Sequence, residues 1–414
     1  MSGPDGPSLP GPANSLQDVA GLRVGHAQRT GDGYLTGTTV VLAPPGGMVA
    51  GVDVRGAAPG TRETELLDPR NLVERAHAIV LSGGSAYGLS AACGVMDRLA
   101  DGGVGFPVEG GVVPIVPAAV IYDLGRGTRF RATPDAAFGH AAYDAATSSP
   151  DPLGQAFPGA GRGKEGGGAP GESSGVAARA NEGGSALGGS IGAGTGAMAG
   201  GLAGGIGGAS VVLPSGVTVA ALAVVNAAGS VLDPGTGVLS GARYGLPGEF
   251  DHLGEPSAEE VAAWRPAGVT SLNTTIGVVA TDLTLTKAQC GKLAGVAHDG
   301  LARAIRPAHT MVDGDTVFAV STCALPPPQP GRTPYGSRPA AVNGPGPGGK
   351  FQDGAVRRAP WDGTAPEGVH LHDLLAAGAD VFSRAVAHAV LAATGRAGAP
   401  AYLDVFPSAL RRTP

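Results

Sequence analysis

The segment 271–321 constrains the fold most strongly, because it places an amphipathic helix between two apolar, β-branched runs. Residues 276–280 have the composition of a strand bounded by polar residues. Thr286 is suited to cap the helix that follows, and Pro307 stops it. The apolar residues of this helix recur four positions apart, at Leu293, Ala297, Leu301 and Ile305. With a second strand over 315–320, the segment predicts a strand–helix–strand unit.

The pair Asn273–Thr274 stands at the mouth of the first of these strands. A threonine hydroxyl is a weak nucleophile unless a base lies beside it, and the nearest base would be the threonine's own α-amine, freed by a cut in the preceding peptide bond. An α-amine titrates near pH ~8, so it can accept a proton at neutral pH. On these residues alone, a polar entry to a strand is the alternative interpretation.

Composition limits what the chain can be. Its 414 residues suffice for one large or two ordinary domains, and 43% hydrophobic residues suffice for a sizeable core. The 73 glycines and 35 prolines favour a turn-rich α/β body with flexible insertions. A net charge of -6 without a basic run argues against nucleic acid or an anionic membrane as a partner.

The cysteines and the N-terminus bear on the compartment. Cys93, Cys290 and Cys323 are widely spaced and odd in number, which suggests neither a disulfide framework nor a metal site. Residues 1–15 lack the basic start and apolar core of a signal peptide. We therefore expect a cytoplasmic protein with reduced thiols and a disordered N-terminus over residues 1–15.

Residues 16–414 are expected to form a single domain with two mobile insertions. Residues 159–189 are rich in Gly, Ala, Ser and Glu, and residues 326–368 are rich in Pro and Gly without an apolar period. Residues 183–232 carry no charge, but Gly dominates the first half of this run and a Pro-Ser-Gly turn divides the second. We therefore predict two buried strands, over 210–213 and 217–225, rather than a membrane span.

Several sequence blocks follow one another in a recognisable order. Leu-Asn-Thr-Thr precedes an apolar strand, Thr-Lys begins a helix, and residues 309–319 read His-Thr-Met-Val-Asp-Gly-Asp-Thr-Val-Phe-Ala. Further blocks lie at 18–26, 52–56, 59–64, 82–88, 117–123 and 192–196. This order resembles the nylon-oligomer hydrolase and L-aminopeptidase/D-Ala-esterase family, the self-cleaving P1-type peptidases. Several blocks in one order are more specific than any single motif.

The resemblance implies both a fold and an activity. The fold would be a four-layer αββα sandwich of the N-terminal-nucleophile-like kind. The activity would be that of a self-processing amidohydrolase or aminopeptidase acting on short peptides or ω-amino-acid oligomers, without a metal or an organic cofactor. Thr274 would be the nucleophile, freed by a cut after Asn273 that leaves an α chain of residues 1–273 and a β chain of residues 274–414. The family's habit implies a homo-oligomer of cleaved αβ pairs.

Four further residues are expected at the site. The resemblance places an active-site asparagine at Asn226, whose amide would donate to a developing oxyanion, although a turn residue at a strand end is equally consistent with the sequence. Tyr122 matches a tyrosine that lines the family's site, but it would also suit a core. Asp313 and Asp315 flank a glycine before a strand. Both carboxylates would face one point near Thr274, unless the glycine makes a turn.

One departure from the family concerns a lysine that its members often carry shortly after the Gly-Ala-Gly-Thr-Gly run. Gly201 stands at that place here. Either the amine of Thr274 is the only base, or a lysine arrives from elsewhere, or activity is weakened. Lys164 and Lys292 are within reach in sequence, and neither fits the pattern.

Two other functions stay open on the sequence. An uncleaved relative that binds an amine-bearing ligand would keep the same fold. The Gly-rich runs at 82–88 and 192–196 would also suit a nucleotide-binding enzyme, although no acidic residue follows the second run at a distance of about 20 residues.

Overall fold

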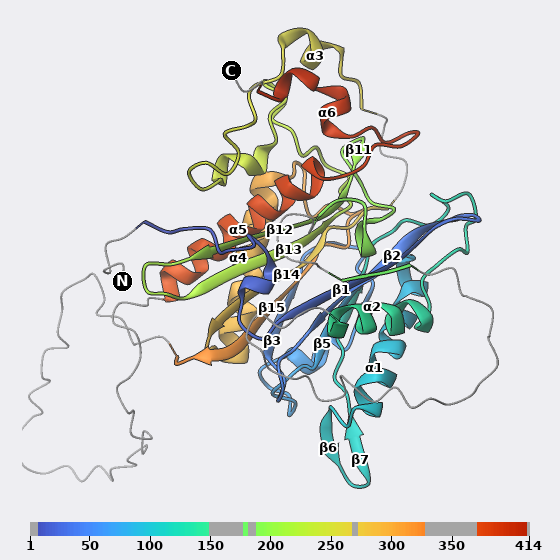
Figure 1. Cartoon of the computed structure of the whole chain (residues 1–414), viewed down its shortest axis with the longest axis vertical. Helices are drawn as coiled ribbons and strands as arrows, with labels where there is room; N and C mark the ends of the chain where they lie inside the picture. The colour runs from blue at the N-terminus through green and yellow to red at the C-terminus, as the bar shows by residue number, and fades with distance from the viewer. Residues whose placement is uncertain (1–6, 149–176, 181–187, 267–271, 328–370, 412–414) are drawn as a thin grey trace, which may run out of the picture.

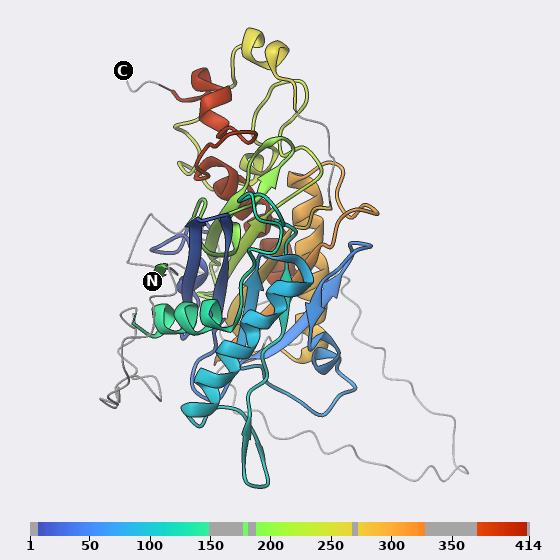
Figure 2. The same cartoon turned by 90° about the vertical axis from the view of Figure 1, so that its right-hand side faces the viewer.

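Two β-sheets lie face to face at the centre of the protein, and helices cover the outer side of each (Figures 1 and 2). The computed structural model describes residues 7–148, 177–180, 188–266, 272–327 and 371–411. The order of layers is therefore helix, sheet, sheet, helix, and the predicted αββα sandwich is confirmed.

The first sheet has five strands, and helices α4 (Lys287–Ala304) and α5 (Leu371–Leu391) cover its outer face. Its order is β12 (Gly205–Val212), β13 (Thr218–Val225), β14 (Ile276–Leu283), β15 (Thr316–Leu325) and β3 (Val49–Val54). Every residue of β13 is buried, because odd positions such as Val219 pack against the helices and even positions such as Leu222 face the other sheet. Burial on both faces explains why the strands of the run 183–232 carry no charged residue.

The second sheet has six strands, and helices α1 (Ala91–Asp101) and α2 (Ala136–Ser148) cover it. Its order is β4 (Thr61–Arg62), β8 (Ala118–Val120), β5 (Ala78–Ser82), β2 (Tyr34–Leu42), β1 (Arg23–Gly31) and β9 (Ala177–Ala180). Apolar side chains from both sheets, such as Ile79 and Phe318, form the core between them. Burial of this apolar surface is the main favourable term for such a fold.

The smaller elements lie mainly at the ends of the sandwich. The hairpin of β6 (Phe106–Val108) and β7 (Gly111–Val113) projects from one end, and α3 (Ala258–Ala263) and α6 (Tyr402–Val405) lie at the other (Figures 1 and 2). A tight hairpin joins β10 (Met198–Ala199) and β11 (Leu202–Ala203). Short 3₁₀ helices span Leu16–Asp18, Thr64–Leu67, Ser85–Ser90, Gly192–Gly194, Ser240–Tyr244 and Pro407–Ala409.

The predicted strand–helix–strand unit is confirmed as β14, α4 and β15. Thr286 caps α4 with its side chain, which accepts from the backbone N–H of Gln289, and Gln289 bonds back in a capping box. The two strands pair in parallel from Ile276–Thr316 onward. Helix α5 is long and apolar enough to cross a membrane, but 72% of its most apolar stretch is buried, as expected of a core helix.

Residues 7–15 depart from the expectation of a disordered segment over 1–15, of which residues 1–6 lie outside the described residues. Leu9 forms an antiparallel bridge with Val212, and Asn14 accepts from the guanidinium of Arg384 on α5. Arg384 is 1% exposed and also pairs with Glu249 at 2.7 Å. This buried network holds residues 7–15 against the first sheet, because an unpaired arginine there would be costly. The expected mobile insertions over 159–189 and 326–368 lie mostly outside the described residues, but residues 177–180 of the first form strand β9, which pairs with β1.

Candidate active site

The backbone at Asn273 continues the parallel ladder of β14 and β15 beyond the end of the strands. Asn273 forms a parallel bridge with Asp313. Its N–H donates to the carbonyl oxygen of Val312 at 2.9 Å, and its own carbonyl oxygen accepts from the N–H of Gly314 at 3.1 Å. The peptide bond between Asn273 and Thr274 is therefore fixed by the central sheet rather than carried on a free loop.

The Thr274 side chain turns back on the carbonyl of the preceding residue. Its Oγ donates to the carbonyl oxygen of Asn273 at 2.5 Å, and its N–H donates to the carbonyl oxygen of Asn226 at 2.6 Å. The residue is 5% exposed. A Cβ on Gly314 would lie 2.9 Å from the Thr274 Oγ, so only glycine leaves the hydroxyl its present place. The predicted nucleophile is thus next to the bond that it would cut.

The two aspartates serve different partners. Asp315 accepts from the N–H of Thr275 at 2.7 Å and from the His309 ring nitrogen Nδ1 at 2.8 Å. Asp313 accepts from the N–H of Thr310 at 2.9 Å and from the Thr310 hydroxyl at 2.5 Å, as in a local turn. Within the described residues, neither carboxylate contacts the Thr274 hydroxyl. Asp315 orients the backbone beside Thr274, whereas Asp313 shapes the loop that carries Gly314.

Asn226 joins the site through its backbone and is buried completely. Its Oδ1 accepts from the N–H of Met198 at 3.1 Å and from Nη1 of Arg126 at 2.5 Å. Its Nδ2 donates to the carbonyl oxygen of Tyr122 at 3.2 Å. Tyr122 is half-buried and contributes this backbone carbonyl oxygen to the site. Both polar atoms of the Asn226 amide therefore already have partners within the protein.

Two arginines at this place were not predicted. Arg126 donates to the Gly196 carbonyl oxygen as well as to Asn226, and Arg396 donates to the carbonyl oxygens of Gly196 and Ala197. Burial lowers the pKa of Arg126 to about 10. Each arginine stands in a short glycine-containing turn, and the local sequence gives no sign that the two meet.

His309 lies between Asp315 and the ring of His298. Its ring lies edge-on to His298 at 4.8 Å between centroids, and the Nε2 of His298 contacts the carbonyl oxygen of Asp53 at 2.9 Å. Burial lowers the pKa of His298 to about 4, and the neighbouring His309 adds to the effect. A cavity of about 490 Å³ adjoins His309 and has a mainly apolar wall, which includes Leu232, Pro234, Ile305 and Pro307.

No described lysine serves the site. Lys287 is buried, and its Nζ donates to three backbone carbonyls far along the chain, those of Leu66, Asn71 and Val73. Lys292 is exposed on α4, and Lys164 lies outside the described residues. Gly201, at the place of the family's lysine, has a φ of 92° in the β10–β11 turn, a conformation that lysine adopts only under strain.

Several backbone N–H groups of the two Gly-rich runs form hydrogen bonds within the protein. In the turn at 82–88, Gly83 donates to Gly37, Gly84 to the Asp123 carboxylate, and Ser85 to Ile121. In the run at 192–196, Gly192 donates to Gln28 and Ala193 to Thr39. These bonds and the close packing around the glycines leave these N–H groups unavailable to a phosphate, so the nucleotide-binding alternative is not favoured.

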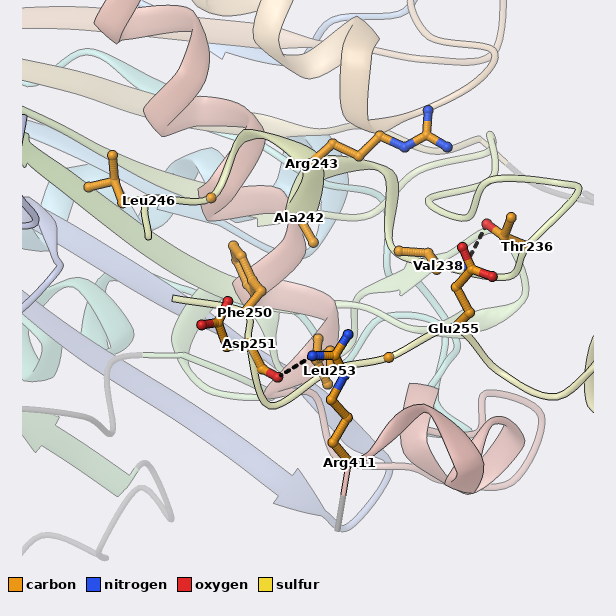
Figure 3. Close-up of a pocket in the computed structure, with 12 residues that line it drawn as sticks. Thr236, Val238, Ala242, Arg243, Leu246, Phe250, Asp251, Leu253, Glu255 and Arg411 are labelled. Atoms are coloured by element: carbon orange, nitrogen blue, oxygen red, sulfur yellow. Dashed lines mark hydrogen bonds between the residues drawn. The ribbon is translucent and has the colours of Figure 1, made fainter. Parts of the chain in front are cut away.

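A further pocket of about 400 Å³ lies apart from these residues (Figure 3). It is lined by the segment 236–255 and by Arg411, which donates to the Asp251 carbonyl oxygen at 3.3 Å. None of the predicted site residues borders it. The candidate active site is therefore the group around Thr274.

Comparison with known sequences matches the chain to one family over nearly its whole length. The model of peptidase family S58 matches residues 14–176 and 172–401. A protein of Mycobacterium tuberculosis named an uncharacterized aminopeptidase is 44% identical over 408 residues, which cover 96% of this chain and 99% of that protein. A 6-aminohexanoate-oligomer endohydrolase of Paenarthrobacter ureafaciens is 31% identical over 309 residues, 74% of each chain.

Solved structures share the fold at lower identity. A Burkholderia sp. beta-aminopeptidase has a TM-score of 0.59 and 22% identity, covering 99% of this chain and 97% of that one. The L-aminopeptidase D-Ala-esterase/amidase of Ochrobactrum anthropi, described as a variant among the Ntn hydrolase fold, has a TM-score of 0.58 and 20% identity, with 99% and 98% covered. The αββα sandwich described above is therefore of the N-terminal-nucleophile hydrolase fold.

Proposed function

The chain belongs to peptidase family S58 and is a hydrolase of peptide or amide bonds, and on that premise we propose that it processes itself between Asn273 and Thr274 and then uses Thr274 as its nucleophile. The observation that carries this proposal is the double contact on the Asn273 carbonyl oxygen. The Thr274 hydroxyl reaches it from one side and the Gly314 N–H from the other.

The chemistry of the cut follows from that arrangement. The Thr274 Oγ attacks the Asn273 carbonyl carbon and closes a five-membered ring, and the negative charge that develops on the carbonyl oxygen meets the Gly314 N–H. The C–N bond then breaks, the nitrogen takes up the hydroxyl proton, and an ester remains. Water hydrolyses the ester, releasing residues 1–273 with a terminal carboxylate and residues 274–414 with a free threonine.

In the processed enzyme, the same groups would serve the substrate. The α-amine of Thr274 stays beside the Asn226 carbonyl oxygen, 2.6 Å away before the cut, and acts as the base for its own hydroxyl. Once Asn273 withdraws, the Gly314 N–H is free to receive the carbonyl oxygen of a substrate amide. Asp315 holds the Thr275 N–H and so fixes the direction of the nucleophile.

The names of the relatives and the chain's cysteines support proposals about the substrate and the location. We expect short amides, either peptides with a free amino terminus or ω-amino-acid oligomers, because the relatives are named aminopeptidases and 6-aminohexanoate-oligomer endohydrolases. We also propose a homo-oligomer of cleaved αβ pairs. All three cysteines are free, which supports a reducing compartment such as the cytoplasm.

Intact mass and a denaturing gel of purified protein test the cut without a substrate. We expect two chains, of residues 1–273 and 274–414. Thr274→Ala should abolish the cut, and the matched variant Thr275→Ala should be cut nearly as well as the parent. A protein that stays in one piece after long incubation would remove the basis of the proposal, and cleavage that depends on Thr275 would move the nucleophile by one residue.

A further inference from the structure

Arg126 and Arg396 come from distant parts of the chain and meet on one acceptor. Nη1 of Arg126 lies 2.6 Å from the Gly196 carbonyl oxygen, and Nη2 of Arg396 lies 3.0 Å from the same oxygen. The two guanidinium groups are therefore neighbours. Both residues keep part of their surface exposed to solvent.

Among the described residues, no carboxylate forms a hydrogen bond or an ion pair with either arginine. Within the described residues, all hydrogen bonds of Arg126 and Arg396 go to neutral oxygens, and neither forms an ion pair. Nη1 of Arg396 is buried and has no partner. A buried donor without an acceptor and two adjacent like charges are both costly, and an anion would relieve both.

The nearby carboxylate of Asp123 does not fill this role. Its oxygens accept from the Thr36 hydroxyl and the Gly84 N–H, each at 2.6 Å, and from neither arginine. Burial also raises the pKa of Asp123, which favours its neutral form. Burial lowers the pKa of Arg126 and the neighbouring Arg396 lowers it further, while the charge of Asp123 offsets this shift only in part.

We propose that Arg126 and Arg396 bind the terminal carboxylate of the substrate, and that the enzyme therefore prefers short peptides or amino-acid oligomers with a free carboxyl end. The inference rests on the proposed function. Asn226 connects Thr274 with the arginine pair, because its carbonyl oxygen accepts from the Thr274 N–H and its side-chain oxygen accepts from Arg126. A carboxylate suits the pair because guanidinium groups bind it with paired, charge-assisted hydrogen bonds.

A kinetic comparison of L-alanyl-L-alanine with L-alanyl-L-alaninamide tests the preference. Release of the second residue is followed by mass spectrometry, and the readout is the ratio of kcat/KM for the acid to that for the amide. Arg396→Gln should lower this ratio ~10- to 100-fold, the usual effect of losing a charge-assisted hydrogen bond. Arg396→Lys, which keeps the charge but not the fork, should lower it less.

Arg129→Gln is the matched control, because Arg129 is an exposed arginine three residues from Arg126 and its guanidinium donates to the backbone oxygen of Asp32. Its ratio should equal that of the parent. A ratio that Arg396→Gln leaves unchanged, in protein that is processed and melts like the parent, would overturn the inference.

A binding experiment separates this inference from the proposed mechanism, because it needs no turnover. In the uncut Thr274→Ala protein, no new carboxylate at Asn273 competes for the arginines. Calorimetric titration with acetate and acetamide, which are small enough to bind at the arginines while Asn273 still occupies the reacting position, should show tighter binding of acetate, and Arg396→Gln should remove the difference. Equal affinities in the Thr274→Ala protein would refute the carboxylate subsite, whatever the fate of the self-cleavage proposal.

Discussion

A single methyl group on Gly314 should slow self-processing strongly. A Cβ at this position would lie 2.9 Å from the Thr274 Oγ and 2.6 Å from the backbone oxygen of Ala58. Real Cβ contacts are not this short, and Ala58 is held by its own N–H bond to the Asp313 carbonyl oxygen. Either the hydroxyl or the Gly314 N–H must therefore move off the Asn273 carbonyl. A displacement of about 1 Å in such a site costs ~100-fold in rate, and loss of an oxyanion donor costs ~100- to 1,000-fold.

The assay follows the fraction of 414-residue precursor by intact mass over time. Gly314→Ala should be processed ~100-fold more slowly than the parent. Gly291→Ala on α4 is the matched control, because a Cβ there meets nothing within 4 Å, and it should be processed at the parent rate with equal or higher stability. If Gly314→Ala is cut as fast as the parent while keeping its melting temperature, the assignment of the Gly314 N–H to the reacting carbonyl is refuted.

Two predictions concern pH. If the Thr274 amine is the base, the single-turnover rate of amide hydrolysis should rise once between about pH 6 and 9, because only the neutral amine accepts the hydroxyl proton. Lys292→Ala should not change the midpoint of this rise. A changed midpoint would show that a lysine acts as the base. Burial opposes the charge of Glu249, but hydrogen bonds from His388 and Arg384 outweigh it and lower the pKa of Glu249 from 4.5 to about 2. The contribution of Glu249 to stability is therefore complete above pH 4.5 and lost as pH falls through about 2. The urea midpoint of Glu249→Gln should vary less with pH over this range than that of the parent. An equal pH dependence of the two midpoints would contradict the stabilising role of the Glu249 carboxylate.

The sequence predicts what is encoded locally and within regular elements. Thr286, the four-residue spacing of apolar positions and Pro307 define α4 because capping, periodicity and ring sterics act over a few residues. The two uncharged strands around residue 215 followed for the same reason. The position of Thr274 at a strand mouth was equally readable, and the family order of motifs gave the layers around it.

The side-chain geometry of the site was not readable, because it depends on contacts between distant segments. Alternation along an extended chain suggested that Asp313 and Asp315 point to one place, but Thr310 binds the first and Thr275 and His309 bind the second. The meeting of Arg126 and Arg396 likewise joins residues 270 positions apart through the carbonyl of a third segment. Nothing in either local sequence encodes that contact.

The order of the central sheet means that cutting the chain would not part its two products. From β12 to β3, the strands would belong in turn to the α, α, β, β and α chains, so the β-chain strands are enclosed on both sides. Covalent continuity is then needed only while the sheet assembles. After the cut, two separate unfolded chains would have to meet before their strands could pair again. Unfolding would therefore be far harder to reverse after the cut than before it. The lifetime of the mature enzyme would then be set by how slowly it first opens.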